Sequence, residues 1–180
     1  IDFHKKLGNL KFLDPACGCG NFLVITYREL RILEIEILKV LSRKEMFTNI
    51  KNVALLDVDQ MYGIEIEEFP ARIAEVAMWL IDHQMNQKLS KEFGVYFLRL
   101  PLQKAANILH GNALRVDWST LLKPRIIETY FYDMGKKEVA GKVKEVKDDY
   151  AYILGNPPFI GKQLQNQRQK EDLELVFQNI

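Results

Sequence analysis

The residues most able to do chemistry in this 180-residue chain form one short motif, Asn156-Pro157-Pro158-Phe159. The two prolines stiffen the backbone and leave no amide hydrogens at their positions. Asn156 carries a side-chain carbonyl and Pro157 a backbone carbonyl, so two fixed acceptors could take both hydrogens of one planar amino group. Phe159 offers a flat surface on which a base could stack. A rigid turn would explain the prolines alone, but the whole set suits the exocyclic amine of a flipped-out nucleobase.

A glycine-containing loop, DPACGCGNF, runs from Asp14 to Phe22 after a short apolar run. Gly18 and Gly20 permit a sharp turn and let a ligand approach the backbone closely. The helix expected after the loop would point its N-terminal amides at the same place, which favours an anion. The third glycine of G-x-G-x-x-G and the Gly-Lys-Ser/Thr of a Walker loop are both absent. Taken alone, the loop fits either a tight turn or a ligand site of another kind.

Two further polar residues also follow apolar runs. Glu65 lies in the run YGIEI, where a carboxylate could accept both hydroxyl protons of a ribose. Asn112, in the run GNAL, carries an amide that could bond the edge of an adenine. Taken singly, Glu65 also fits an exposed charge and Asn112 a common Gly-Asn turn. Both residues become candidates for a binding site because, like the first two motifs, they follow an apolar run.

Each motif follows a run that reads as a strand. Four apolar runs predict strands, at residues 10–13, 62–66, 106–109 and 150–154. Helical spacing predicts three helices, at about 22–43, from 67 or 68 to about 86, and at about 168–178. This alternation indicates a Rossmann-like α/β protein, with a mainly parallel twisted sheet and helices on both faces. Ligands of such sheets bind beyond the carboxyl ends of the strands, so we expect all four motifs to meet at one edge.

The periodicity also predicts which helix residues are buried. In the first long helix the expected apolar face is Leu23, Tyr27, Leu30, Ile37 and Leu41, and the polar residues are Arg28, Arg31, Glu34 and Lys39. In the second we expect burial of Ile73, Ala74, Ala77, Leu80 and Ile81. The stretch 125–149 fits neither period, and both a hairpin and a mobile insertion remain open. Its lysines (Lys136, Lys137, Lys142, Lys144 and Lys147) could touch phosphate, but we favour a solvated face because acidic residues offset them.

Composition narrows the class of protein without naming a partner. A chain that is 48% hydrophobic can build one domain with a sizeable core. A net charge of +1 neither supports nor excludes nucleic acid, since binding needs a basic face rather than a basic total. No run reaches the ~18 apolar residues of a membrane span, so we expect no membrane. Cys17 and Cys19 are separated by one residue, which is too close for an easy disulfide, so we expect a reducing, cytoplasmic setting. Two cysteines and three scattered histidines do not make the ligand set of a structural zinc, so we expect no metal site.

Together the motifs resemble those of class I S-adenosylmethionine-dependent DNA methyltransferases that modify an exocyclic amine. DPACGCGNF is similar to their cofactor motif, GIEI to their acidic ribose motif and NPPF to their catalytic motif. The longer runs YGIEIEEFPARIAEVAMWLIDHQMN, ILHGNAL and YILGNPPFIGKQ most resemble the methyltransferase part of single-chain restriction–modification enzymes that act on N6 of adenine. The resemblance covers about residues 10–163.

The resemblance implies a role for each matched residue. The cofactor S-adenosylmethionine would contact Asp14, Ala16, Cys17, Gly18, Gly20, Glu65, Ile66, Asn112 and Ala113. Within this set Glu65 would hold the ribose hydroxyls, Ile66 would lie against the adenine ring, and Asn112 stands where the family more often has Asp. The catalytic loop that holds the target base would be Asn156, Pro157, Pro158 and Phe159.

The implied reaction is direct transfer of the methyl group to N6 of a flipped-out adenine in double-stranded DNA. Methylation of a protein glutamine, which uses a similar Asn-Pro-Pro-aromatic loop, and of the cytosine amine are alternatives, as is a non-catalytic cofactor- or DNA-binding subunit. Asn rather than Ser at position 156 favours adenine. We expect residues 1–180 to be a partial catalytic domain without the target-recognition domain and any nuclease, and the sequence leaves the oligomeric state open.

Overall fold

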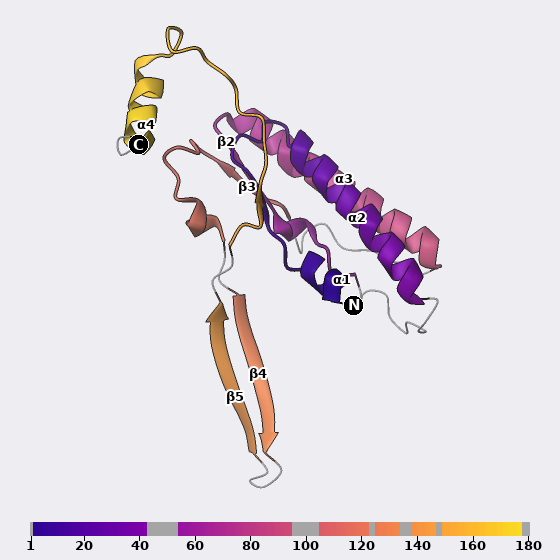
Figure 1. The fold of residues 1–180 in the computed structure, drawn as a ribbon. Helices are drawn as coiled ribbons and strands as arrows, with labels where there is room; N and C mark the ends of the chain where they lie inside the picture. The colour runs from indigo at the N-terminus through magenta and orange to yellow at the C-terminus, as the bar shows by residue number, and fades with distance from the viewer. Residues whose placement is uncertain are drawn as a thin grey trace. The chain divides into compact units, whose positions relative to one another are not determined.

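The computed structural model describes residues 2–42, 54–94, 105–122, 125–133, 138–146 and 149–177. They belong to two compact units, residues 1–116 with 150–180, and residues 117–149 (Figure 1). The helices are α1 (Asp2–Leu7), α2 (Asn21–Ser42), α3 (Glu68–Phe93) and α4 (Gln167–Phe177), with short 3₁₀ helices η2 (Val58–Gln60) and η3 (Trp118–Leu121). The strands are β1 (Phe12–Asp14), β2 (Met61–Glu65), β3 (Asn107–His110), β4 (Arg125–Asp133), β5 (Glu138–Val146) and β6 (Tyr152–Ile153).

The first unit is built on a parallel sheet of four strands in the order β3-β2-β1-β6. Asp14 is in register with Gly63, and Glu65 is in register with His110. The carboxyl ends of neighbouring strands therefore lie together along one edge of the sheet. The predicted α/β class and the parallel sheet are confirmed, and all four strands lie where the sequence placed them to within two residues at each end.

The two long helices cover one face of this sheet. α2 connects β1 to β2, and α3 connects β2 to β3; the two helices pack against each other and against β2 (Figure 1). The two crossovers step in the same direction along the sheet, and crossovers of one hand then place both helices on the same face. Helices were expected on both faces, but among the described residues the long ones share one.

α3 is longer than predicted and is rotated relative to its predicted face. It ends at Phe93 rather than near Asn86, and Gly94 closes it in the left-handed conformation with φ 63°. Ile73 and Leu80, expected in the core, are 36% and 45% exposed. Ala77, also expected in the core, is half-buried. The buried face consists of residues spaced by three or four, namely Ala71, Ala74, Met78, Ile81, Met85 and Leu89. The methionines fill the core-facing positions, which leaves Ile73 and Leu80 on the flank.

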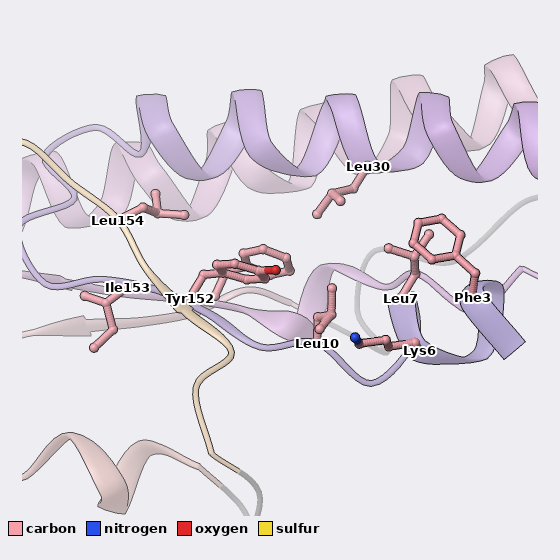
Figure 2. Close-up of a pocket in the computed structure, with 9 residues that line it drawn as sticks. Phe3, Lys6, Leu7, Leu10, Leu30, Tyr152, Ile153 and Leu154 are labelled. Atoms are coloured by element: carbon pink, nitrogen blue, oxygen red, sulfur yellow. The ribbon is translucent and has the colours of Figure 1, made fainter.

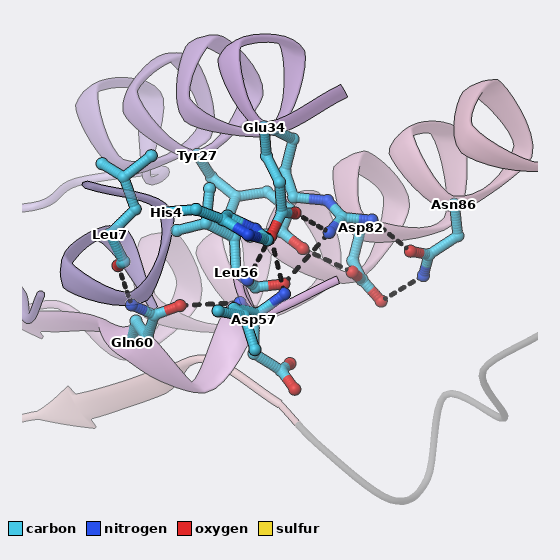
Figure 3. A network of polar contacts seen from close by, with 11 residues as sticks. His4, Leu7, Tyr27, Glu34, Leu56, Asp57, Gln60, Asp82 and Asn86 are labelled. Atoms are coloured by element: carbon cyan, nitrogen blue, oxygen red, sulfur yellow. Dashed lines mark hydrogen bonds and ion pairs between the residues drawn. The ribbon is translucent and has the colours of Figure 1, made fainter. Parts of the chain in front are cut away.

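A buried ion pair corrects the prediction for α2. Arg31 and Glu34 belong to the polar set of the sequence pattern, yet both are fully buried. Arg31 Nη1 donates to Glu34 Oε2 at 2.6 Å, and Arg31 Nη2 donates to Asn86 Oδ1 at 2.9 Å. Glu34 Oε1 accepts from the amides of Leu55 and Leu56 at 2.6 and 2.9 Å (Figure 3). Hydrophobic periodicity treats every charged residue as polar and therefore predicts that it is exposed. It cannot show that opposite charges three residues apart on a helix are buried together as an ion pair.

The same network joins further elements (Figure 3). His4 of α1 lies 3.0 Å from Glu34, and Tyr27 of α2 donates to Asp82 of α3 at 2.6 Å. Asp82 also accepts from Asn86 at 3.0 Å. Burial raises the pKa of the Tyr27 phenol well above its ordinary value of 10.0, so the phenol stays a hydrogen-bond donor. Because buried polar groups are costly when unpaired, this network favours one packing of α1, α2 and α3.

The second unit contains an antiparallel hairpin of β4 and β5. Arg125 lies opposite Val146, and Asp133 lies opposite Glu138. Of the two possibilities that the sequence left open for this stretch, the hairpin is confirmed. Before it, Asp117 caps η3 by accepting from the Ser119 amide at 3.0 Å. The side chains of the lysine-rich segment 136–147 lie outside the described residues, and their role stays a prediction.

Replacing Glu34 with alanine should destabilise the first unit strongly. The change leaves the Arg31 guanidinium buried without its carboxylate, which typically costs about 3–5 kcal/mol in the free energy of unfolding. The matched control is Glu36→Ala on the same helix, since Glu36 is exposed and its pair with Lys39 is screened by water and should contribute little to stability. Urea unfolding followed by circular dichroism measures both. Equal effects of the two substitutions would contradict a structural role for the buried pair.

Candidate active site

The carboxyl edge of the sheet brings the four predicted loops together. The Gly18 amide donates to Glu65 Oε2 at 2.8 Å, which joins the first loop to the second. The Gly111 amide donates to the backbone oxygen of Glu65 at 2.8 Å, which joins the second to the third. A Cβ on Gly155 would lie 2.6 Å from Asp14 Oδ1, so the fourth loop packs directly on the first. The predicted convergence of the four motifs is confirmed.

Close backbone packing shapes the first loop. Gly18 and Gly20 have φ of 53° and 84°, in the left-handed region that other residues rarely adopt. A Cβ on Gly20 would lie 3.1 Å from Ala74 Cβ, so the start of α2 lies directly against α3. A Cβ on Gly63 of β2 would lie 2.8 Å from Cys17 Sγ. Gly63 was not among the predicted site residues, although a glycine inside a strand often marks a close approach of another segment.

Asp14 ends β1 with a carboxylate that is only partly satisfied. Its Oδ1 accepts from the Ala16 amide at 3.1 Å, whereas no described residue donates to the buried Oδ2. Burial raises the pKa of the Asp14 carboxyl above its ordinary value of 3.8. The hydrogen bond from the Ala16 amide lowers this pKa in part, and the nearby charge of Glu65 raises it. A buried acceptor without a donor is costly. Oδ2 is therefore suited to a ligand that brings a donor, above all a positively charged one.

Glu65 ends β2 with both carboxylate oxygens anchored. Oε2 accepts from Gly18 and Oε1 accepts from the Glu67 amide at 3.0 Å. A carboxylate has about four acceptor positions, so positions remain for the two hydroxyls of a ribose. Ile66 follows with 59% of its surface exposed, and His110 Nε2 lies 3.1 Å from its backbone oxygen. A polar group for a sugar and an apolar group for a ring thus stand side by side.

The third loop is tied to α4 through its asparagine. Asn112 Oδ1 accepts from the Leu114 amide at 2.9 Å, and Asn112 Nδ2 donates to Asp172 Oδ2 at 2.7 Å. Arg115 Nε donates to Asp172 Oδ1 at 2.6 Å. The hydrogen bond from Arg115 holds the pKa of Asp172 below its ordinary value of 3.8, and the Asn112 amide adds to the effect. Asp172 carried no sequence signal, because its partners lie about sixty residues earlier. Ala113, the other predicted residue of this loop, is half-buried.

The fourth loop presents its motif openly. Asn156, Pro157, Pro158 and Phe159 follow β6 outside regular secondary structure, and all four are exposed. The ring of Phe159 is 96% exposed and so is free to stack against a flat ligand. The Leu154 amide donates to the backbone oxygen of Leu13 at 2.8 Å, which holds the start of the loop beside β1.

A groove lined in part by Leu154, the residue just before the fourth loop, lies beside β6. It has a volume of about 460 Å³ and lies between α1, α2 and β6 (Figure 2). Its walls are largely apolar: Phe3, Lys6, Leu7, Leu10, Phe12, Leu30, Tyr152, Ile153 and Leu154. No predicted site residue lines it. Within the described part of the chain, no group of three or more His, Cys, Asp or Glu side chains could hold a metal ion, and no helix is long and apolar enough to cross a membrane.

This parallel sheet, with its ligand loops gathered at the carboxyl edge, defines a methyltransferase fold of class I. The family described as "MmeI, DNA-methyltransferase domain" matches residues 1–180, and the chain belongs to this family. DNA methyltransferase A of Bacillus subtilis (strain 168) is 38% identical over 173 residues, which are 96% of this chain and 17% of that protein. The Type IIL restriction–modification enzyme MmeI, solved in complex with DNA, is 52% identical with a TM-score of 0.79, over 99% of this chain and 21% of that one. The chain thus spans about a fifth of the length of these relatives.

The Cys17 thiol should resist ionisation in the folded protein. Burial raises its pKa from 9.0 to about 12, and the charges of Asp14 and Glu65 add to the effect. In a Cys19→Ser variant at pH 9, we expect iodoacetamide to label the native Cys17 at least about tenfold more slowly than the unfolded chain, because only the thiolate reacts. Since the folded pKa lies above the unfolded one, stability should fall as the pH rises from 9 towards 12. Mass spectrometry of the peptide carrying residue 17 gives the rate, and rapid native labelling would contradict the assignment.

Proposed function

We propose that this chain binds S-adenosylmethionine at the carboxyl edge of its sheet and transfers the methyl group to N6 of adenine in DNA, as part of a restriction–modification enzyme. One observation carries the proposal: Gly155 lies so close to Asp14 that the Asn156-Pro157-Pro158-Phe159 loop must border the first loop. Membership of a DNA-methyltransferase family supports DNA as the substrate.

The residues of the edge fit the cofactor in chemistry and in order. The unpaired Oδ2 of Asp14 suits the ammonium of the methionine part, and the open space above Gly18, where a Cβ would meet nothing within 4 Å, leaves room for the chain of that part. Glu65 has acceptors left for the ribose hydroxyls, and the exposed Ile66 suits the adenine ring. Asn112 and Ala113 would then face the polar edge of that ring.

The fourth loop would hold the target base. The Asn156 side-chain oxygen and the Pro157 backbone oxygen would accept the two hydrogens of the amine, and Phe159 would stack on the ring. The amine nitrogen of adenine is a poor nucleophile because its lone pair is delocalised. Two acceptors held in place favour a pyramidal nitrogen, whose lone pair is free to react.

The bound cofactor would supply a methyl group on a positively charged sulfur. The amine nitrogen would form a bond to the methyl carbon as the carbon–sulfur bond breaks, which leaves the sulfur as a neutral thioether. Both N–H groups would stay bonded to Asn156 and Pro157 during the transfer, and one of the two protons would afterwards pass to solvent. The role of the protein would therefore be to align and polarise the amine. Alignment of this kind can accelerate a reaction greatly without a covalent intermediate.

Target recognition and any nuclease would reside outside residues 1–180. Double-stranded DNA with a flipped-out adenine would be the partner, and the cytoplasm would be the location. Methylation of a protein glutamine or of the cytosine amine, and binding without transfer, are the competing functions.

Replacing Glu65 with alanine in the intact protein should weaken binding of S-adenosylhomocysteine, the demethylated product. Loss of hydrogen bonds to a charged group costs on the order of 1.5–3 kcal/mol, so the dissociation constant should rise about tenfold or more. Glu67→Ala is the matched control, because Glu67 is exposed and its side chain makes no capping bond to α3. Calorimetry measures both variants. Unchanged affinity of Glu65→Ala would refute the ribose contact.

Replacing Asn156 with alanine should separate chemistry from binding. One of the two acceptors is lost while the cofactor loops stay intact, so turnover should fall about a hundredfold or more at nearly unchanged cofactor affinity. Phe159→Ala should instead weaken capture of the flipped base, since stacking contributes ~1–3 kcal/mol per base. Gln163→Ala, exposed and just beyond the motif, is the control.

The assay for both variants is transfer of a tritiated methyl group to duplex DNA, followed by nucleoside analysis. Label in N6-methyladenine with the parent, and its loss with Asn156→Ala, would support the proposal. Near-normal transfer by Asn156→Ala would defeat the mechanism. Label found in methylcytosine or on a protein glutamine would assign the site to one of the competing substrates, and cofactor binding without transfer would make the protein a binding subunit.

A further inference from the structure

The buried residue of α4 is a carboxylate. Asp172 is 6% exposed, whereas the apolar residues beside it on the helix, Leu173, Leu175, Val176 and Phe177, are 36–62% exposed. Burial of an aspartate on an otherwise exposed helix is unusual, because carboxylates are rarely buried unless they are paired. The contacts of Asp172 therefore show which part of the protein α4 packs against.

Both oxygens of Asp172 are directed at the loop that follows β3. Oδ1 accepts from Arg115, with Nε and Nη2 each at 2.6 Å. Oδ2 accepts from Asn112 Nδ2 at 2.7 Å. The ion pair alone would attach α4 to the loop, so the second hydrogen bond has a separate effect, on the side chain of Asn112.

That effect is to fix the orientation of an amide. An asparagine amide has a donor end and an acceptor end of nearly the same shape, and its environment decides which way it points. Asp172 can only accept, and the backbone N–H of Leu114 can only donate, so together they hold opposite ends of Asn112. The side-chain oxygen of Asn112 is therefore held facing the backbone of its own loop at Leu114. Its second lone pair can accept a further hydrogen bond.

We propose that Asp172 is a positioning residue that selects adenine in the cofactor, by keeping the oxygen of Asn112 turned towards the ring's exocyclic amine. The inference rests on the proposed binding of S-adenosylmethionine at this edge. An acceptor at this point favours an adenine ring, which carries an amine, over a hypoxanthine ring, which carries an oxygen. Recognition of the cofactor's base thus depends on a residue that lies after the catalytic loop in the chain.

The test replaces Asp172 with asparagine in the intact protein. The introduced amide has a single acceptor oxygen, and the charged Arg115 should take it because a charge-assisted hydrogen bond is the stronger one. The amide nitrogen of the new side chain would then face Asn112 and turn it over. Calorimetry compares S-adenosylhomocysteine with its inosine analogue, in which an oxygen replaces the amine. We expect the parent to prefer the adenine form by about fivefold or more, and D172N to lose this preference.

A second variant exchanges the two side chains. In N112D/D172N, the carboxylate at position 112 accepts from the Leu114 amide and from the side-chain amide introduced at position 172, so an acceptor again faces the ring. We expect this double variant to regain the preference for adenine. N112D alone puts two carboxylates side by side and should bind both analogues less tightly. The four proteins form a double-mutant cycle that isolates the coupling between the two residues.

The control is Glu174→Gln, which removes one negative charge from an exposed position of the same helix. Loss of the preference in D172N, its return in the double variant and no effect of E174Q would support the proposal. An equal loss of affinity for both analogues in D172N would assign Asp172 a purely structural role and overturn it. So would an unchanged preference. Failure of the parent to bind either analogue would overturn the proposed function itself, which is a different result.

Discussion

The hydrogen bond from the Gly18 amide to the Glu65 carboxylate, 2.8 Å long, is the contact on which the candidate site depends. It closes the first loop over the end of β2, where Gly63 has no side chain and so leaves room for Cys17. The same carboxylate accepts from the Glu67 amide at the start of α3. One side chain therefore joins the loop after β1, the end of β2 and the beginning of a helix, and still has acceptor positions for a ligand.

The two long helices, α2 and α3, support this contact. α2 begins in the first loop and α3 begins just after Glu65, so a shift of either helix would move a part of the site. Two buried hydrogen bonds join α2 to α3, from Arg31 to Asn86 and from Tyr27 to Asp82, and they oppose such a shift because it would leave buried polar groups without partners. The polar network and the loops of the candidate site thus lie at different places along the same two helices.

The sequence could predict what depends on neighbours in the chain, and it failed where distant side chains decide. The four strands of the parallel sheet, the presence of α2, α3 and α4, and the meeting of the four loops follow from local patterns and from the geometry of parallel sheets, whereas α1 was not predicted. Burial of Arg31 was missed because its partners include Asn86, fifty-five residues away. Ile73 was misplaced because the core position fell to methionines of the same helix. Asp172 was missed because only the folded chain brings it to Asn112.

The strand order gives the last helix its importance. In the order β3-β2-β1-β6, the third and fourth loops stand at the two ends of the sheet, about 14 Å apart at a strand spacing of roughly 4.8 Å. The chain leaves β6 through the Asn156 motif and then brings Asp172 to the loop after β3. Residues 155–166, which can span up to about 40 Å, therefore connect one end of the site to the other. The Asn156 motif and the third loop are therefore joined by two routes, through the strands of the sheet and through α4.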